Sequence, residues 1–576
     1  MAQLDEIRHS LAHLLASAVL EHDPEAKLGV GPVIENGFYY DIQFSSSFSD
    51  ETLPSLEARM RELIGENLSF ERIDATPAQA REQFAHQPFK LELIDDLEKA
   101  GEAISLYQTG TFIDLCRGGH VDKTGEIKGD AFKLTKVAGS YWRGDEKNAR
   151  LIRIYGIAFE SKEDLDTYLT QMEEAEKRDH RKVGKELDLF TFSELVGAGL
   201  PLWTPRGTIL RTELDAYIWE LRSKYGYERV TIPHITKRDL YEKSGHWEKY
   251  GDDLFRINTR EGKEYAMKPM NCPHHAQLFD RHPHSYRQMP QRYCETTMVY
   301  RDEQSGELGG LTRVLSITQD DSHVFCRQTQ VKEEFFRIWD IVDTFYNTFG
   351  FKLRARLSFH DPKTPEKYLG TPETWKSAED ALREIARERG ADSFEAPGEA
   401  AIYGPKLDFM AKDSIGREHQ VATIQLDMLQ PERFDLTCVN EKGEKERVVM
   451  IHCAVMGSIE RFSAVLLEHT GGALPLFLSP VQASVLPVKE EHEVYAQGIV
   501  NALKERGVRA ELSLGDNLGK RIRATKVMKT PCTIVIGDKE IESNTLTLEH
   551  RDGSKNENLT LEDLTEKIAS AISSRS

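Results

Sequence analysis

The feature that most constrains the fold is a set of strand patterns joined by turns too short to hold a helix. Residues 403–427, YGPKLDFMAKDSIGREHQVATIQLD, form one such pair around the turn at 414–416, and residues 298–325 form another around a Gly-rich loop. Parallel neighbours need a crossover of a dozen or more residues, whereas antiparallel neighbours need only a short turn. The sequence therefore predicts a largely antiparallel sheet in the middle of the chain.

Helical and strand patterns flank this central sheet. In residues 209–233 the apolar positions recur at helical spacing, and a short strand pattern then ends at Pro233; these positions are Leu210, Leu214, Tyr217, Ile218 and Leu221. Residues 163–189 are polar and helix-favouring, which predicts a connecting helix between domains. After residues 478–482, strand and helix patterns alternate, which predicts a separate small α/β domain.

The composition is that of a soluble, multidomain protein. The chain has 576 residues, 39% of them hydrophobic and 30% charged, and no apolar run approaches the roughly 18 residues needed to cross a membrane. Asp5 and Glu6 stand where a signal peptide would carry positive charge. The seven cysteines are scattered and odd in number, a usage typical of a reducing compartment. We therefore expect a cytoplasmic protein without a membrane anchor.

The net charge of −20 argues against indiscriminate binding of nucleic acid, although a local basic face is compatible with it. Two basic stretches stand out, HRKVGK at 180–185 and GKRIRATKVMK at 519–529. Either stretch is a candidate nucleic-acid contact or a solvated helix face, and the sequence does not decide between the two.

Three distant residues form a candidate metal site. Cys272 in MKPMNCPHH, His323 in QDDSHVF and His452 in MIHCAVMG are residue types that zinc prefers. A catalytic zinc site keeps three protein ligands and an open position, which this set would provide. The separations match no short zinc motif, so ordinary core residues are the alternative interpretation.

A second set lies near the N-terminus. His9 and His13 in HSLAH are four apart and share one side of a predicted helix. Cys116 and His120 in CRGGH are also four apart, across two glycines that indicate a loop. Together the four predict a metal-like or hydrolytic site, with structural histidines as the alternative.

A series of motifs spread over nearly the whole chain resembles bacterial threonyl-tRNA synthetase, a class II aminoacyl-tRNA synthetase. The motifs, in chain order, are HSLAH, GPVIENGFYYDI, KLELI, DLCRGGH, GSYWRGD, RDHRKVGKELDLF, SGHW, MKPMNCP, YRDE, TRVLSITQDDSHVFC, YGPKLDF, TIQLD, HCAVMGSIERF and GDKEIES.

The resemblance implies an α+β multidomain fold. We expect an N-terminal α+β editing domain at 1–162, a connecting helix at 163–189, a class II catalytic domain with an antiparallel sheet at 190–476 and a C-terminal α/β anticodon-binding domain at 477–576. Family members usually begin with a ubiquitin-like domain ahead of HSLAH, and the sequence starts without one. The resemblance also implies a homodimer paired through the first class II motif, the helix and strand that end at Pro233.

The implied reaction is activation of L-threonine by ATP with Mg2+, followed by transfer to the 3′ end of tRNA(Thr). Adenylyl transfer needs cations around the triphosphate. Arg301 in YRDE matches the second class II motif and is expected to bridge the α-phosphate and the carboxylate of the amino acid. Glu303 is expected at the adenine amino group, Arg313 at the phosphates, and Arg461 in GSIERF, from the third motif, at the γ-phosphate and the adenine face.

The family places zinc at Cys272, His323 and His452. An open zinc position can take the amino group and the hydroxyl of threonine together, so valine, which lacks the hydroxyl, is one ligand short. A site built to bind a hydroxyl rejects analogues without it by large factors. Asp321 is expected to accept the hydroxyl proton. The other residues expected around threonine are Gln319, Gln420, Thr423 and Gln425.

Serine keeps the hydroxyl and differs by one methyl group, which is worth only ~1–3 kcal/mol. A second, hydrolytic site is therefore needed to remove serine from mischarged tRNA. The resemblance assigns it to His9, His13, Cys116 and His120, with Lys90 and Asp114. In the family this cluster works without a bound metal, and from the residues alone zinc there stays open.

The remaining expectations concern tRNA. His246 in SGHW matches the position that takes a proton during transfer, with a packing histidine beside Trp247 as the alternative. Lys406, Arg523 and Glu540 match tRNA-contacting positions.

Several positions depart from the usual family pattern: His274 for Gly, Gly309 for His, Leu315–Ser316 for Arg-Gly, Ile317 for an aromatic residue, Gly515 for Asn and Glu549 for Arg. Two other readings use some of the same residues. A paralogue that binds tRNA-like RNA without charging it would be expected to lose some of Arg301, Glu303, Arg461 and the Cys/His/His set. A stand-alone zinc hydrolase leaves the ATP motifs and the C-terminal domain without a role.

Overall fold

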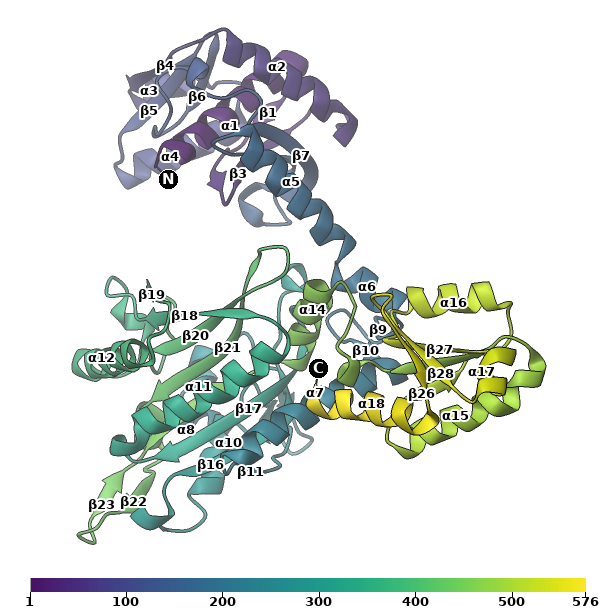
Figure 1. The fold of residues 1–576 in the computed structure, drawn as a ribbon. Helices are drawn as coiled ribbons and strands as arrows, with labels where there is room; N and C mark the ends of the chain where they lie inside the picture. Colours follow the sequence, from purple (N-terminus) through teal and green to yellow (C-terminus); the bar gives the residue numbers. More distant parts are fainter. Residues whose placement is uncertain (1, 576) are drawn as a thin grey trace. The chain divides into compact units, whose positions relative to one another are not determined.

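The computed structural model describes residues 2–575 and divides into two compact units, Met1–Glu173 and Glu174–Ser576 (Figure 1). Among the described helices, none is long and apolar enough to cross a membrane.

The first unit is built on a long helix, α1 (Ala2–His22), which packs with α2 (Leu53–Gly65) against a five-stranded sheet. The sheet has the order β1-β3-β8-β7, with β2 paired to β3. Its strands are β1 (Lys27–Leu28), β2 (Val33–Ile34), β3 (Gly37–Gln43), β7 (Phe132–Tyr141) and β8 (Arg150–Ala158). Leu11 and Leu15 of α1 are fully buried against this sheet, which fixes the face that carries His9 and His13.

A second, smaller sheet completes the first unit. Strands β4 (Phe70–Ala75), β5 (Ile104–Thr109) and β6 (Phe112–Leu115) pair antiparallel, and α3 (Pro77–Gln83) and α4 (Pro88–Ala100) cover them. The loop 116–120 leaves the end of β6 and approaches α1. Gly118 in this loop has a φ of +109°, and a side chain there would collide with the hydroxyl of Tyr107, so the turn requires glycine.

The predicted single connecting helix is two helices. Helix α5 (Lys162–Lys177) ends at Lys177, and α6 (His180–Glu186) begins after a break at Arg178 and Asp179. The side chain of Asp179 accepts a hydrogen bond from the backbone N–H of Arg181 and caps α6, which explains the break inside a segment of uniformly polar, helix-favouring composition.

The predicted antiparallel sheet is confirmed in the second unit. Its eight strands have the order β11-β16-β17-β24-β21-β20-β18-β19, and only the two edge pairs, β11–β16 and β18–β19, are parallel. The strands are β11 (Glu228–Arg229), β16 (Gln291–Tyr300), β17 (Ser316–Cys326), β18 (Lys352–Phe359), β19 (Ser393–Pro397), β20 (Lys406–Lys412), β21 (Glu418–Asp427) and β24 (Val449–Ala454).

Helices cover this sheet. The main ones are α7 (Pro205–Lys224), α11 (Val331–Thr348), α12 (Pro372–Arg389) and α14 (Ile459–Thr470), with the short helices α8 (Arg238–Ser244), α9 (His246–Lys249), α10 (Cys272–Phe279) and α13 (Leu429–Arg433) near one end. Two small sheets flank them, β12 (Ile235–Lys237) with β14 (Glu264–Met267) and β13 (Arg256–Asn258), and β15 (His284–Ser285) with β22 (Thr437–Val439) and β23 (Lys445–Arg447). The pair β9 (Phe190–Thr191) and β10 (Leu202–Trp203) precedes α7.

The apolar stripe of α7 lies inside the core of its own chain. Leu210 and Leu214 are completely buried, and Ile218 and Leu221 join the same cluster as α11 and the central sheet. The stripe therefore packs within one subunit and does not by itself indicate a dimer interface.

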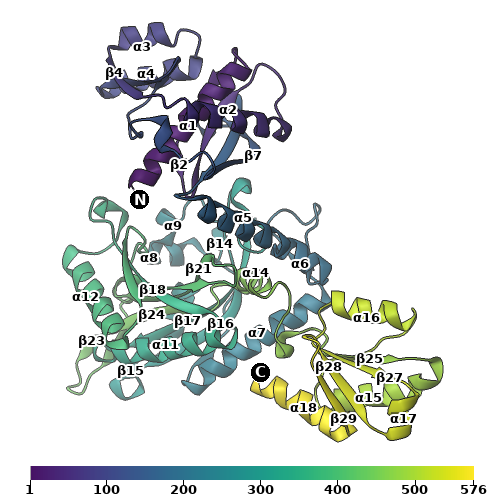
Figure 2. The same cartoon turned by 45° about the horizontal axis from the view of Figure 1, so that its top comes forward.

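The C-terminal part of the second unit is the predicted α/β domain. Its sheet has the order β26-β25-β27-β28-β29, formed by β25 (Ala483–Pro487), β26 (Ala510–Leu512), β27 (Cys532–Ile536), β28 (Leu546–His550) and β29 (Lys555–Leu559). Helices α15 (Glu493–Glu505) and α18 (Leu561–Ser574) bury their apolar residues against it. Figure 2 shows α16 (Leu518–Val527) and α17 (Asp538–Ser543) in the same domain.

Candidate functional site

The three candidate metal ligands converge. His323 on β17 and His452 on β24 are direct cross-strand partners, and Cys272 is the first residue of α10. His323 Nε2 lies 3.1 Å from His452 Nδ1, and one ligand atom from each of the three residues lies within 4.8 Å of the others. All three side chains are buried. The antiparallel register of β17 and β24 is what brings residues 129 positions apart together.

Two further residues orient these imidazoles. The Asp427 carboxylate accepts a hydrogen bond from His452 Nε2 at 2.9 Å, which leaves Nδ1 of His452 facing His323. His275 Nδ1 lies 2.8 Å from His323 Nδ1. Metal-ligating histidines usually have such a partner on the second ring nitrogen. Neither Asp427 nor His275 was expected from the sequence, although His275 lies three residues after Cys272 on α10, a spacing that puts both on one helix face.

The donor set fits a zinc ion. Burial raises the pKa of the Cys272 thiol well above its usual value and lowers the pKa of His323 well below its own, so the imidazole keeps a lone pair at neutral pH. A cysteine sulfur, which binds zinc as the thiolate, and two imidazoles are ligands that zinc prefers over calcium or magnesium. His274, singled out for its unusual position, lies outside this set: neither of its ring nitrogens has a hydrogen-bond partner among the described residues.

Polar side chains border the Cys/His/His cluster. Asp321 lies two residues before His323, and its Oδ1 is 3.8 Å from His323 Nε2. Its Oδ2 accepts a hydrogen bond from Asn271 at 2.9 Å, a residue the sequence analysis did not include. Gln425 on β21 is the cross-strand partner of His452, and its buried side-chain amide nitrogen has no hydrogen-bond partner in the part of the chain described. Gln319 lies on β17, partly exposed.

Gln420 and Thr423, predicted at threonine, and Lys406, predicted at tRNA, meet at one buried carboxylate that was not expected from the sequence. Asp408 on β20 is fully buried and accepts hydrogen bonds from Thr423 Oγ1 at 2.7 Å and Gln420 Nε2 at 3.0 Å. Lys406 Nζ lies 3.3 Å and Arg356 Nη2 3.0 Å from the same carboxylate. An ionisable residue inside the apolar strand pattern YGPKLDF was the available signal.

The predicted ATP-binding residues surround the hairpin between β16 and β17. Arg301 and Glu303 follow β16, and Arg313 donates to the Glu303 carboxylate at 2.8 Å. The Nε atom of Arg301 is buried without a hydrogen-bond partner among the described residues, a costly arrangement unless an anion binds there. Arg461 lies in the first turn of α14, exposed to solvent. Ile317, where the family has an aromatic residue, lies on β17 opposite Val299.

His246 lies close to the Cys/His/His cluster. Its Nε2 is 3.9 Å from the Cys272 sulfur, and its Nδ1 is 2.8 Å from the hydroxyl of Ser244. Burial lowers the pKa of His246 to about 3, so the imidazole is neutral at pH 7. The same burial makes it a weaker base than an exposed histidine.

The N-terminal cluster also assembles. Cys116 Sγ lies 3.4 Å from His9 Nε2 and 3.3 Å from His120 Nε2. The rings of His9 and His120 stack at 4.2 Å, and His13 meets His120 edge-on at 4.2 Å. The Ser10 hydroxyl lies 3.2 Å from His120 Nδ1 and orients that ring.

Lys90 and Asp114 form a buried ion pair beside this cluster. Lys90 Nζ lies 2.6 Å from Asp114 Oδ1, and His13 Nε2 lies 4.0 Å from Asp114 Oδ2. The sequence analysis missed the third member, Tyr40 on β3, which donates to Asp114 at 2.5 Å and accepts from Lys90 at 2.9 Å. The motif GPVIENGFYYDI contains it.

Burial keeps the groups of the N-terminal cluster uncharged. It lowers the pKa of His120 to about 2 and that of His13 well below its usual value. Burial also raises the pKa of Cys116 to about 11. At neutral pH the cluster therefore holds neutral imidazoles and a protonated thiol, which can hydrogen-bond a water molecule.

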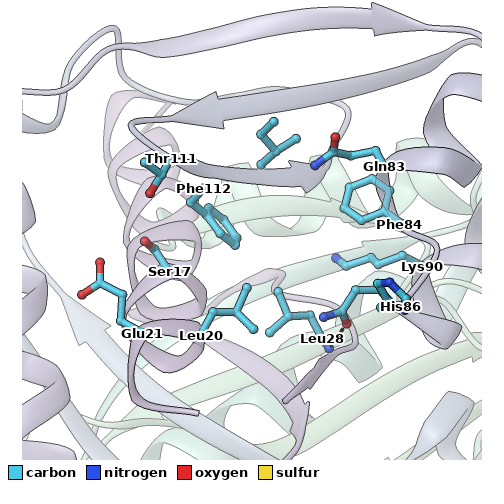
Figure 3. A pocket seen from close by; sticks show the side chains of 12 residues that line it. Ser17, Leu20, Glu21, Leu28, Gln83, Phe84, His86, Lys90, Thr111 and Phe112 are labelled. Carbon is cyan, nitrogen blue, oxygen red and sulfur yellow. Dashed lines mark hydrogen bonds between the residues drawn. The ribbon is translucent and has the colours of Figure 1, made fainter. Parts of the chain in front are cut away.

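Two hollows open beside these groups. One, of about 500 Å³, is lined by His9, Cys116, Ser105, Leu97 and Glu102, a volume within the usual range for a small-molecule site. The other, of about 360 Å³, is shown in Figure 3, where Lys90 and Phe112 approach from opposite sides. The first hollow is the one that reaches the Cys–His cluster.

The predicted anticodon contacts lie in the C-terminal domain. Arg523 is exposed on α16, on the basic stretch 519–529. The neighbouring Arg521 is buried and bonds three backbone carbonyls, so it supports the helix. Glu540 accepts a hydrogen bond from the backbone N–H of Gly537 at the start of α17.

Three family models match consecutive parts of the chain: one in the first unit, one in the catalytic part of the second unit and one in its C-terminal domain. Residues 104–155 match the second additional domain of threonyl and alanyl tRNA synthetases. Residues 255–470 match the class II tRNA synthetase core domain (G, H, P, S and T), and residues 482–571 match an anticodon-binding domain. With the antiparallel sheet and the residues gathered on it, these matches define the chain as a class II aminoacyl-tRNA synthetase.

Similar sequences identify the family within this class. The chain is 49% identical over 540 residues to the threonine–tRNA ligase of Porphyromonas gingivalis, covering 92% of this chain and 82% of the relative. It is 46% identical over 574 residues to that of Rubrobacter xylanophilus, covering 99% and 89%. A structure of the RNA-binding domain of threonyl-tRNA synthetase from Cryptosporidium parvum superposes with a TM-score of 0.65 at 39% identity, covering 68% of this chain and 98% of that one. The chain belongs to the threonine–tRNA ligase family.

Proposed function

We propose that the protein activates L-threonine with ATP and Mg2+, transfers it to tRNA(Thr), and hydrolyses seryl-tRNA formed in error. The observation that carries this proposal is the buried Cys272–His323–His452 cluster with Asp321 at its edge; the cluster shares β17 with the hairpin whose loop carries Arg301 and Arg313. A degenerate paralogue would have no reason to retain both sets.

The proposal divides the chain by task. Residues 1–162 edit, residues 163–189 connect, residues 190–476 form and transfer the adenylate, and residues 477–576 read the anticodon through contacts that include Arg523 and Glu540. Arg301 Nε is buried without a hydrogen-bond partner in the described part of the chain, which supports an anion site for the α-phosphate, with Arg313, Glu303 and Arg461 around the nucleotide.

Threonine would bind where Asp321, Gln319 and Gln425 border the cluster, with Gln420 and Thr423 held by Asp408. A zinc ion bound by Cys272, His323 and His452 would supply an electrophilic position for the amino group and hydroxyl of threonine. Asp321 would accept the hydroxyl proton, which a valine side chain cannot offer. Lys406, bound to Asp408, would contact the 3′ end of the tRNA.

The first prediction concerns amino-acid choice and metal content. Wild-type protein should catalyse ATP–pyrophosphate exchange with threonine, weakly with serine, and at least about a hundredfold less with valine, because valine leaves buried polar groups unpaired. Elemental analysis should find one zinc per chain in the catalytic unit. Cys272→Ser should lose that zinc and the exchange activity.

His274→Gly is the matched control for Cys272→Ser, since this imidazole lies outside the ligand set. It should keep both zinc and exchange activity. Full zinc content in the double variant Cys272→Ser with His274→Gly would overturn the ligand assignment.

The second prediction concerns transfer. We propose that His246, neutral and close to the Cys272 sulfur, accepts a proton as the threonyl ester forms on the 3′-hydroxyl. His246→Ala should slow single-turnover transfer by about 10²- to 10⁴-fold while exchange changes little. Equal losses in both steps would assign His246 to packing beside Trp247 instead.

The third prediction concerns editing. The lowered pKa values of His13 and His120 favour orientation of a water molecule over proton uptake, and Lys90, Asp114 and Tyr40 support the cluster from behind. His9→Ala combined with His13→Ala should activate threonine normally but accumulate seryl-tRNA and fail to deacylate it when supplied.

A structural zinc site is the competing role for the four-residue cluster, since all four ligand atoms lie within 4.8 Å of one another. In that case the double variant would lose a second zinc and its first unit would unfold, visible by circular dichroism. Wild-type deacylation by the double variant would remove these histidines from editing altogether.

We further propose a homodimer that functions in the cytoplasm. The apolar stripe of α7 does not support the dimer, because it is buried in the core of its own chain. Two exposed apolar side chains near the first motif support it: Ile235 is 51% exposed and Met298 is 36% exposed. Light scattering should give twice the chain mass, and a single-chain mass at micromolar concentration would contradict it. Seven free cysteines suit a reducing compartment, which cell fractionation tests.

A further inference from the structure

The stretch HRKVGK, first considered as a basic nucleic-acid contact, contains one residue that the proposed function leaves unexplained. His180 is 5% exposed, although Arg181, Lys182 and Lys185 around it face solvent. Buried histidines are retained where their ring nitrogens have partners, so the partners of His180 decide its role.

Both ring nitrogens of His180 are engaged, each by a different element. Nδ1 lies 2.7 Å from Glu468 Oε1 on α14, and Nε2 accepts a hydrogen bond from the backbone N–H of Leu311 at 3.0 Å. A nitrogen that accepts does not carry a proton, so the ring proton lies on Nδ1 and is directed at Glu468. His180 therefore joins α14 to the loop between β16 and β17.

Further hydrogen bonds hold the Glu468 carboxylate in place. Its Oε1 also accepts from the backbone N–H of His180 at 3.2 Å, and its Oε2 accepts from Arg417 at 2.6 Å. Glu468 lies two turns along α14 from Arg461. The helix that carries the third-motif arginine thus holds the imidazole in place.

The Leu311 side belongs to the loop that carries the second-motif residues. Leu311 lies between Glu303 and Arg313, and the loop closes on itself where Gly309 N–H donates to the Arg313 carbonyl at 3.1 Å. Gly310 has a φ of +55°, and a Cβ there would overlap His180 Nε2. The backbone passes so close to the imidazole that only glycine fits, which is an independent sign that the contact is built into the loop.

A metal site is not the explanation, although Asp179, His180 and Glu468 lie close enough to share an ion. The Asp179 carboxylate is taken by the guanidinium and the backbone N–H of Arg181, and both His180 nitrogens have partners. The ligand atoms are therefore already used within the protein.

We propose that His180 is a positioning residue for ATP: by accepting from the Leu311 N–H while bound to Glu468, it holds the second-motif loop in register with the third-motif helix. The proposal rests on the proposed nucleotide-binding roles of Arg301, Glu303, Arg313 and Arg461. On this proposal, the motif RDHRKVGKELDLF contributes to the adenylation step through the imidazole of His180.

His180→Ala should raise the KM for ATP in threonine-dependent ATP–pyrophosphate exchange by about tenfold, because the buried Leu311 N–H loses its acceptor. The KM for threonine should rise less than the KM for ATP, and the zinc content should not change, because Cys272, His323 and His452 lie on α10, β17 and β24 and not on the loop. Lys182→Ala, an exposed neighbour on the same helix, is the matched control and should match wild type. Calorimetric titration with ATP alone should show the same tenfold weakening.

Two conservative variants separate positioning from packing. Gln places an amide oxygen near the location of Nε2, whereas Asn reproduces only the donor at Nδ1. His180→Gln should recover most of the ATP affinity and His180→Asn should resemble His180→Ala. Recovery by Asn but not by Gln would assign the residue to its contact with Glu468 and overturn the proposal.

Gly310→Ala disturbs the same contact from the side of the loop and leaves His180 in place. It should raise the KM for ATP by itself. Its effect should shrink in the His180→Ala background, where the overlap with the ring is gone and only the positive φ and the contact with the flexible Arg181 side chain remain; residues in contact are expected to be non-additive. Multiplicative effects, or an unchanged KM in His180→Ala, would overturn the proposal. Absence of threonine-dependent exchange in the wild type would instead contradict the proposed function.

Discussion

The antiparallel pairing of β17 with β16 and β24 is the constraint on which the rest of the catalytic unit depends. Its register sets His323 opposite His452 and carries Asp321 to the edge of their cluster, while the β16–β17 hairpin delivers Arg301, Glu303 and Arg313. Because side chains alternate across a strand, a slip of one residue would turn His323 to the opposite face and dissolve the site. The position of these site residues therefore depends on the strand register of β16, β17 and β24.

The two Cys–His clusters are both buried, and burial has the same effect on the pKa values in each. Desolvation favours the uncharged form: it lowers the pKa of His120 and of His323, and it raises the pKa of the thiols of Cys116 and Cys272. The clusters differ in their supports: His452 rests on the Asp427 carboxylate, whereas the N-terminal cluster is backed by the ion pair of Lys90 and Asp114. A carboxylate bonded directly to a ligand imidazole orients it toward a cation.

Much of the architecture could be predicted because it is encoded locally. Turn residues at 414–416 and the Gly-rich loop after Arg301 marked two hairpins that are present, and the helical spacing of Leu210 and Leu214 marked α7. The break between α5 and α6 was missed because composition there is uniformly polar, and a single cap at Asp179 decides it. Asp408, Tyr40 and His275 were missed for another reason: each acts on a residue of a different element, and local patterns carry no record of such partners.

The sequence by itself determined the elements, their order and, through its motifs, the family to which the chain belongs. Periodicity, turns and caps are properties of neighbouring residues, so they can be read along the chain. Only the tertiary structure decided that the α7 stripe faces its own core, that His275 rather than His274 supports the metal-like cluster, and that His180 reaches both Glu468 and Leu311. The physical reason is that these choices depend on which surfaces pack together and exclude water, and packing joins residues whose separation along the chain is arbitrary.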